Sequence, residues 1–469
     1  MVNQIQREFD GLGNLLTEWQ AVAGAVNTST SPKVQYAWSF APSGSTNHNR
    51  LTSITYPNGR VITYNYASGL NADISRLTSI SDGGTTLESY EYLGYGTVVK
   101  RGHAEPAVDL NYVKYSGESN GDAGDQYAGL DRFGRIVDQR WTTSTPTAKE
   151  RRQYGYDRDS NRLYMDNIVE TTRSELYAYD GFNQLTSMDR GTLNGGKNGL
   201  TGAASRAQDW DYDGLGNWDS LTTDGGSAVT RGHNKQNEIT SISGLSTPTY
   251  DANGNMLTDE AAKQFVYDAW NRLKIVKSSG GSTLATYSYD AEGRRVREVR
   301  GGTTTDLYYS SQWQVLEERV SGTAVKSYVW SPVYVDAMIA RDRDSDSNGS
   351  LEERLYAVHD ANFNVVALLD TSGAVVERFA YDAFGVFSVL TPAWGTRGSS
   401  SYGWNYLHQG GRWDADGQIY YFRLRGYGPS IGRWLQSDPI GMWAGDVNLY
   451  RSEFNSPLRY LDATGLQSV

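Results

Sequence analysis

The stretch Tyr267-Asp268-Ala-Trp-Asn271-Arg272-Leu273 decides the fold of this chain. It contains an aromatic residue, an aspartate, two variable residues, a Gly or Asn, a polar residue and then an apolar run. An aspartate carboxylate can accept a hydrogen bond from a backbone amide two residues later, and Asn or Gly tolerates a positive φ. The stretch therefore predicts the end of one β-strand, a tight turn and the start of the next strand.

The same pattern recurs along the chain, so the turn is a repeating unit. Further copies lie at Phe9-Asp10, Tyr156-Asp157, Tyr179-Asp180, Tyr212-Asp213, Tyr250-Asp251, Tyr289-Asp290 and Tyr381-Asp382, with a degenerate copy at Asn234. Asp251 and Asp268 are 17 positions apart, and Asp268 and Asp290 are 22 apart, which is about one hairpin. Hairpins placed in series form a long antiparallel sheet, which must coil or close to protect its edges. The sequence therefore predicts an all-β fold in which antiparallel hairpin repeats spiral into a shell or barrel.

The composition supports this prediction and narrows the function. The 469 residues include 51 Gly, 33 Tyr and 13 Trp but only 11 Pro, as expected for aromatic strands joined by glycine turns. There is no cysteine, and five scattered histidines do not indicate a His-rich metal centre. The net charge of −11 lacks the basic footprint of a nucleic-acid-binding protein. No apolar run is long enough for a membrane span.

The C-terminal region carries a second, more specific pattern. Its motifs are Gln418–Pro429, Gly432–Gly441, Asn448–Tyr450, Asn455–Pro457 and Asp462–Leu466, in unbroken order. With the Tyr-Asp repeats, they resemble the YD-repeat or rearrangement hotspot (Rhs) family and its Rhs-associated core, which is related to the shells of the Tc-toxin C subunit and of teneurins. The resemblance implies a hollow spiralling β-shell, plugged by the core, that carries a toxin polypeptide inside.

Four parts of the chain follow from these patterns. Residues 1–129 are expected to form irregular repeats, residues 130–340 regular YD repeats, residues 341–403 hairpins with an acidic loop, and residues 404–469 the Rhs-associated core.

The resemblance also implies self-cleavage, because bacterial relatives often cut themselves after the Leu of a terminal Asp-Pro-x-Gly-Leu. Here that bond is Leu466–Gln467. The catalytic candidates are Asp438 and Asp462, since two close carboxylates can share a proton and act as base and acid. Arg425 or Arg433 could hold a carboxylate ionised or polarise the carbonyl. The alternative is that both aspartates only fix turns.

Two residues depart from the family pattern at this site. Ala463 stands where the family has proline, and Gly426 follows Arg425 where some cleaving relatives have an Arg-Asp pair. One carboxylate of those relatives is therefore missing, and any enzymatic activity is expected to be limited to autoproteolysis.

An acidic loop suggests Ca²⁺ as the only cofactor. Its alternating oxygen donors are Asp342, Asp344, Asp346 and Asn348, followed by Gly349, with Glu352 as a further ligand in a non-EF-hand geometry. An EF-hand loop beginning at Asp344 would need glutamate at its twelfth position, where Leu355 stands. The alternative is a solvated acidic hairpin tip.

Three functions remain open at this point. The first is a shell scaffold of an Rhs-type protein, secreted or on the cell surface of a bacterium, with a toxin polypeptide and secretion machinery as partners. The second is an extracellular recognition scaffold that binds carbohydrate or a surface protein without cargo. The third is a glycoside-active enzyme, because aromatic side chains can stack on sugars.

Overall fold

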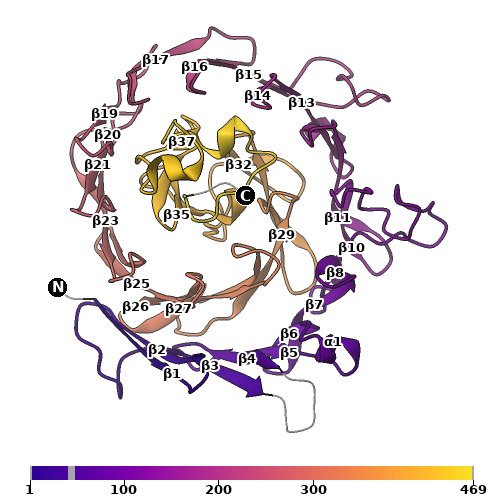
Figure 1. Ribbon diagram of the computed structural model, residues 1–469, viewed down its shortest axis with the longest axis vertical. Coiled ribbons are helices and arrows are strands. Elements are labelled where there is room, and N and C mark those ends of the chain that lie inside the picture. Colours follow the sequence, from indigo (N-terminus) through magenta and orange to yellow (C-terminus); the bar gives the residue numbers. More distant parts are fainter. Residues whose placement is uncertain (1–2, 41–47, 467–469) are drawn as a thin grey trace.

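The computed structural model describes residues 3–40 and 48–466, and nearly all of its secondary structure is antiparallel β-strand. The strands follow one another around a ring and spiral inward (Figure 1). The predicted all-β spiral of hairpins is therefore confirmed. No helix among the described residues has the length and apolar character to cross a membrane.

The first sheet forms most of the ring. Each of its strands pairs antiparallel with the next one in the chain. The strands are β1 (Gln4–Phe9), β2 (Leu15–Ala21), β3 (Lys33–Phe40), β4 (Asn49–Thr55), β5 (Val61–Asn65), β6 (Ser79–Asp82), β7 (Thr85–Leu93), β8 (Thr97–His103), β9 (Val108–Asn111), β10 (Asp138–Thr143), β11 (Ala148–Tyr156), β12 (Arg162–Asn167), β13 (Glu175–Tyr179), β14 (Leu185–Arg190), β15 (Arg206–Tyr212), β16 (Trp218–Thr223), β17 (Val229–His233) and β18 (Ile239–Ile242).

The second sheet continues the same winding. Its strands are β19 (Thr249–Tyr250), β20 (Met256–Thr258), β21 (Gln264–Tyr267), β22 (Leu273–Lys277), β23 (Thr283–Tyr289), β24 (Arg295–Arg300), β25 (Thr303–Tyr309), β26 (Val315–Val320), β27 (Thr323–Trp330), β28 (Met338–Arg343), β29 (Glu353–His359), β30 (Val365–Leu369), β31 (Val375–Tyr381), β32 (Phe387–Leu390) and β33 (Thr396–Arg397).

A four-stranded sheet lies in the C-terminal core, which we define as residues 404–466. It contains β34 (Arg412–Asp414), β35 (Ile419–Phe422), β36 (Arg425–Gly428) and β37 (Arg433–Trp434). The short helices are α1 (Leu70–Asp73) and the 3₁₀ turns η1 (Thr171–Arg173), η2 (His408–Gly410), η3 (Gly441–Ala444) and η4 (Glu453–Asn455).

The YD turns have the hydrogen bonds that the sequence predicts. In the turn after β21, the Asp268 Oδ1 accepts hydrogen bonds from the amides of Trp270 (2.9 Å) and Arg272 (3.1 Å), and Asn271 has a φ of 60°. The same pair of amide bonds occurs at Asp10, Asp131, Asp180, Asp213, Asp251, Asp290 and Asp360. One carboxylate thus fixes each of these turns.

The tyrosine before the aspartate ties several of the turns to the preceding one, whereas the buried hydroxyls of Tyr179 and Tyr267 have no hydrogen-bond partner among the described residues. Tyr156 donates its hydroxyl to the carbonyl oxygen of Ile136 (2.8 Å), Tyr289 to that of Leu273 (2.5 Å), and Tyr381 to that of Val365 (2.6 Å). In each case the acceptor lies five residues after the aspartate of the preceding turn, which is Asp131, Asp268 or Asp360. The Tyr-Asp pair therefore stabilises two consecutive hairpins at once.

The two ends of the spiral overlap, so part of the ring has two layers. Strands β1–β8 lie outside β26–β29 (Figure 1). The Tyr56 hydroxyl donates to the Tyr328 carbonyl across the layers (2.7 Å), and the Trp141 indole donates to the carbonyl of His359 (2.8 Å). The largest apolar cluster of the protein fills the space between these layers, as in a β-sandwich.

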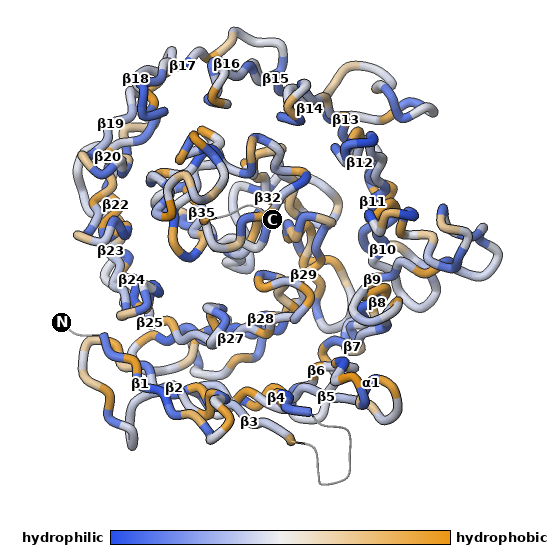
Figure 2. Tube along the Cα trace, in the orientation of Figure 1, coloured by the Kyte–Doolittle hydropathy of each residue, from blue (hydrophilic) through white to orange (hydrophobic). Residues whose placement is uncertain are grey.

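The C-terminal core lies inside the ring (Figure 1). Strands β1–β33, which we call the wall, show mixed hydrophobic and hydrophilic segments (Figure 2). Ile419, Ile431 and Leu435 of the core pack with Ile239 and Met256 of the wall. The inner face of the wall is therefore covered by the chain's own last 60 or so residues, which close the spiral from within.

Candidate functional site

The C-terminal core binds the YD turns of the wall through their main-chain carbonyl groups. The residue three positions after the turn aspartate, or after Asn234 in the degenerate copy, has a positive φ. Its carbonyl accepts a hydrogen bond from a core side chain in four consecutive turns. The pairs are Ser456 to Asn183, Asn455 to Gly216 (2.7 Å), Arg433 to Asn237 (2.7 Å) and Tyr450 to Gly254 (2.8 Å). The repeated turn is thus both a structural device and the binding surface for the core.

Two glycines are required where the core approaches these turns. A Cβ at Gly254 would lie 2.4 Å from the Tyr450 hydroxyl oxygen, and a Cβ at Gly216 would lie 2.3 Å from an Arg451 nitrogen. Both glycines also have a positive φ. The glycines of the repeat therefore serve the turn and the close packing of the core.

The two candidate catalytic aspartates lie together in the core, on either side of one arginine. Arg425 Nη2 lies 2.8 Å from Asp438 Oδ2 and 3.7 Å from Asp462 Oδ2, and the three side chains are buried. The guanidinium also packs over the Trp434 ring, 4.3 Å from its centroid. The structure thus joins residues from β36 and from two loops of the core in one buried charge cluster.

The cluster holds the residues that precede the candidate cleavage bond. Asp462 Oδ1 accepts hydrogen bonds from the amides of Gly465 (2.8 Å) and Leu466 (3.1 Å), and Arg425 Nε donates to the Gly465 carbonyl. Asp438 Oδ1 accepts from the Ile440 amide (2.9 Å). Both aspartates therefore fix turns through Oδ1 while their Oδ2 atoms face Arg425. Gln467, the other residue of the candidate bond, lies outside the described residues.

Burial sets the protonation behaviour of the cluster. Burial raises the pKa of Asp438, although the Arg425 charge opposes this effect. Burial also lowers the pKa of Arg425 to about 10, so the guanidinium stays charged at neutral pH. An arginine between two aspartates favours ionised carboxylates, whereas acid–base cleavage of a peptide bond needs one protonated carboxyl group.

The second candidate arginine is not part of this cluster. Arg433 donates to the Asn237 carbonyl of the wall and packs over the Tyr450 ring, 4.9 Å from its centroid. Of the two arginines named from the sequence, the structure brings only Arg425 to the aspartates. Arg433 fastens the core to a YD turn.

Sequence reasoning missed one residue, the buried carboxyl group of Glu453. It lines the same small cavity as Arg425, Asp438, Asp462 and Leu466 and is 5% exposed. Burial, with the nearby Asp462 charge, raises the pKa of Glu453 well above its usual range. Glu453 belongs to a turn whose three residues all have positive φ without being glycine, a costly conformation. This unusual backbone conformation marks Glu453 in the structure, but no sequence pattern predicts it.

Gly426, where the sequence lacks the expected carboxylate, lies in a crowded part of the core. A Cβ at Gly426 would meet Ile419 Cδ1 at 3.2 Å and Gln436 Oε1 at 3.6 Å. The Gly426 amide donates to that same Gln436 oxygen (2.9 Å). With Asp438, Asp446 and Asp462, Glu453 is one of four carboxyl groups that line this cavity.

The acidic loop brings together only part of its predicted calcium ligands. Carboxylate oxygens of Asp344, Asp346 and Glu352 lie within 4.8 Å of one another. Asn348 donates to Asp346 Oδ2 (3.0 Å), and its own Oδ1 accepts the Ser350 amide (2.7 Å), so it stabilises the turn. Calcium binding here stays a prediction, which calorimetry on chelator-treated protein would test.

Asp342 lies away from that group and has a different structural role. Its carboxylate pairs with Arg354 (2.7 Å) and with Arg60 (2.8 Å). Arg60 follows β4 in the outer layer, so this pair joins the two layers of the overlap. The structure therefore separates Asp342 from the other predicted ligands.

The fold and the cluster define a class, a spiral β-shell that is closed from within by its own C-terminal core. The teneurin YD-shell family matches residues 199–458, more than half of the chain. The chain belongs to this family.

Several curated proteins share part of this sequence. The tRNA nuclease WapA of Bacillus subtilis (strain 168) is 28% identical over 267 residues, which are 55% of this chain and 11% of WapA. The double-stranded DNA deaminase toxin A of Burkholderia cenocepacia (strain H111) is 26% identical over 377 residues, covering 73% of this chain and 23% of the toxin. The chain thus spans a small part of the length of these relatives.

Solved structures of Tc toxins have the same fold. The complex TcdB2-TccC3-Cdc42 matches 98% of this chain with a TM-score of 0.72 at 19% identity, over 23% of its own chain. A Tc holotoxin pore of Photorhabdus luminescens matches 100% of this chain with a TM-score of 0.74, also at 19% identity and over 23% of its chain. At this identity the similarity concerns the fold.

Proposed function

We propose that this chain is the plugged part of an Rhs-type shell that encloses or presents the polypeptide following Leu466. One observation carries the proposal: side chains of the core bind the carbonyls of consecutive YD turns, and the last described residues lie within the ring (Figure 1). The toxin names of the relatives agree with a toxin polypeptide as partner. The proposal includes export from a bacterial cell with the help of secretion machinery.

We further propose that the core cuts the Leu466–Gln467 bond. Water would attack the Leu466 carbonyl carbon and give its proton to an ionised carboxylate. A protonated carboxyl group would give a proton to the Gln467 nitrogen as the C–N bond breaks, which leaves a new carboxyl group and a free amine. Asp438 and Asp462 are the pair that we assign, with Arg425 holding their charge. The buried Glu453 supports the proposal because it offers a protonated carboxyl group in the same cavity.

Intact-protein mass spectrometry tests the cleavage. Purified protein is expected to end at Leu466, and Asp438→Asn protein is expected to keep Gln467–Val469. Asp446→Asn is a matched control, because Asp446 lines the cavity but pairs with Arg451 (2.7 Å). Wild-type protein that keeps its last three residues after days at pH 7 would refute cleavage. An Asp438→Asn chain that still ends at Leu466 would refute the assigned pair.

Exposed aromatic side chains favour recognition of a surface as a second candidate function. Phe182 and Trp270 project from YD turns and Trp443 from the core, and they are 86%, 76% and 94% exposed. Carbohydrate or a surface protein could stack on such rings. Intrinsic Trp fluorescence with a panel of polysaccharides would reveal binding, which Trp270→Ala and Trp443→Ala should abolish.

A further inference from the structure

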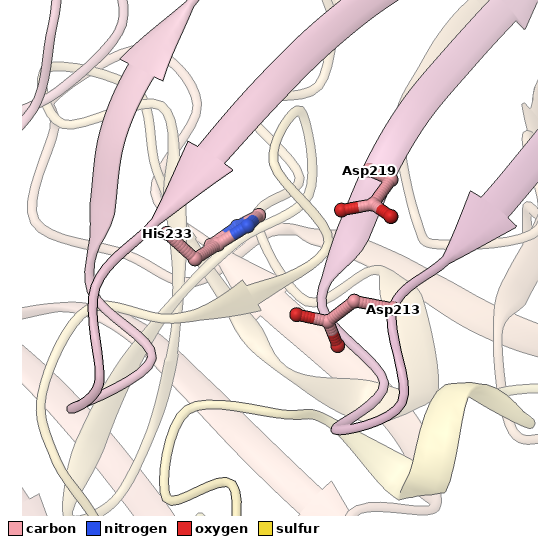
Figure 3. Close-up of side chains that lie close together, drawn as sticks. All are labelled: Asp213, Asp219 and His233. Atoms are coloured by element: carbon pink, nitrogen blue, oxygen red, sulfur yellow. The ribbon is translucent and has the colours of Figure 1, made fainter.

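Three side chains that can bind metal ions converge on the wall, away from the carboxylate cluster of the core. Asp213 begins the turn after β15, Asp219 lies on β16, and His233 ends β17 (Figure 3). One ligand atom from each lies within 4.8 Å of the other two. Two carboxylates and one imidazole are a donor set that first-row divalent cations such as Zn²⁺ accept.

The spacing of these atoms suits a bridging cation better than a direct contact. In the described part of the chain, His233 forms no ion pair within 4.0 Å of either carboxylate, although all three atoms fall within 4.8 Å. Zinc binds imidazole nitrogen and carboxylate oxygen at about 2.0–2.2 Å in a tetrahedral arrangement, so two ligand atoms stand about 3.4 Å apart. The three ligand atoms, which lie within 4.8 Å of one another, would need only small side-chain rotations to reach one ion.

His233 departs from the repeat at a position where the departure creates a ligand. In the regular repeat this position holds the tyrosine that donates its hydroxyl to the preceding hairpin, as Tyr156, Tyr289 and Tyr381 do. The imidazole is shorter than a phenol and makes no hydrogen bond among the described residues. A coordinating nitrogen thus replaces a structural hydroxyl at one point of the wall.

Asp219 is a second departure in the same repeat. It lies six residues after the turn aspartate Asp213. The matching positions in other repeats hold Val137, Thr186, Lys274, Val296 and Val366. Two changes that both add metal ligands therefore coincide on neighbouring strands.

The charges around the three residues also bear on cation binding. Burial, with repulsion from Asp213 and Asp211, raises the pKa of Asp219, and a cation would relieve this repulsion. Arg433 of the core and Arg231 of β17 are the positive charges that act on His233. Burial and these two charges lower the pKa of the imidazole to about 4, so it is neutral at pH 7.

We propose that Asp213, Asp219 and His233 bind a divalent transition-metal cation of the Zn²⁺ type in the wall of the shell. Water would complete the coordination, because the structure supplies three ligands. The ion would fasten β15, β16 and β17 together where the repeat loses its tyrosine bond. This inference does not depend on the proposed cargo or cleavage.

Calorimetry with ZnCl₂ tests the site on tag-free, chelator-treated protein. We expect binding by the wild type, with a rise in the melting temperature. His233→Tyr restores the residue of the repeat, so the fold should persist while the affinity falls at least tenfold and the melting shift disappears. Asp219→Thr introduces the residue that Thr186 provides at the matching position of another repeat, and it should act in the same direction.

The matched control is His48→Tyr, because His48 is the other histidine that is not buried in the described chain. This variant should bind Zn²⁺ like the wild type. Absence of heat from the wild type would overturn the proposal. An unchanged affinity of the His233→Tyr protein would also overturn it, since the ion would then bind elsewhere, for example in the acidic loop.

Discussion

Two regions of the wall are built from the same repeat but have different surroundings. In β30 the sequence Val-Val-Ala-Leu-Leu is buried at all five positions, because the strand lies in the inner layer near the core. In β15, which has no second layer of wall, buried Gln208 and Trp210 alternate with exposed Asp209 and Asp211. The comparison teaches that the turn defines the repeat, whereas the layer in which a strand lies determines its side chains.

Loss of a buried charge partner in the overlap should have the largest effect. Arg101 pairs with Glu88, whose side chain is fully buried and also accepts a hydrogen bond from Ser331 Oγ of the inner layer (3.1 Å). Arg101→Met removes the main partner of the Glu88 charge and leaves only His103 at 3.8 Å, so the free energy of unfolding should fall by about 3–5 kcal/mol. Denaturant titration measures this loss.

The surface pair of Arg132 and Asp122 gives the matched control. It has a similar geometry, with a separation of 2.8 Å, but both side chains are about half exposed. Arg132→Met should leave the denaturation midpoint unchanged. Equal effects of the two substitutions would contradict the proposed difference between the overlap and the surface.

A cavity in the overlap should cost slightly less. Leu368 in β30 is fully buried, so Leu368→Ala should lower the free energy of unfolding by about 2–5 kcal/mol. Leu221 in the single-layered β16 is only partly buried, so Leu221→Ala should cost much less. If the two substitutions shift the denaturation midpoint by the same amount, β30 is not enclosed as the structure shows.

The overlap should also make stability depend on acid. Although burial opposes it, the Arg101 charge lowers the pKa of Glu88 to about 2. The unfolded chain has an ordinary glutamate pKa near 4.5, so the Glu88 contribution is fully present above that pH. It is lost as the pH falls from about 4.5 to about 2. Glu88→Gln should flatten this part of the stability profile, and an unchanged profile would exclude Glu88 as its source.

The smallest effect should come from the turns, and it should depend on whether the core binds them. Asp131→Ala removes two amide hydrogen bonds in a turn for which the structure gives no bond to the core. The cost should be about 1 kcal/mol. Asp251→Ala removes the same bonds and also loosens the turn that holds the Gly254 carbonyl against the Tyr450 hydroxyl. Its cost should be larger, and thermal unfolding of both variants decides the point.

Much of the fold could be predicted from local chemistry, because Asp268 and its equivalents specify a turn through bonds to residues two and four positions later. The overlap could not be predicted in this way. It depends on contacts such as that of Tyr56 with Tyr328, 272 residues apart. The sequence also could not show that the positive-φ residues of the turns offer their carbonyls to the core.

The candidate site could be predicted only in part, because it too depends on contacts between distant parts of the chain. The family motifs named Asp438 and Asp462, which the structure places on either side of Arg425, and their catalytic role stays a prediction. The surroundings of Arg433 and Glu453 depend on how the core enters the ring, and the partners of Asp342 depend on the overlap of the two layers, which no local pattern encodes. The cluster of Asp213, Asp219 and His233 likewise appears only when three strands align.

Hydrogen exchange on the intact protein tests the central claim, that the core and the wall form one closed unit. The Met256 amide of the wall donates to the Leu435 carbonyl of the core (2.8 Å), and the Trp434 amide donates within the core to Tyr450 (3.0 Å). We predict that both amides are protected as strongly as those of β30, and that Arg433→Met accelerates their exchange together. Fast exchange of the core amides beside a fully protected wall would contradict the account, because the core would then be a loosely attached segment.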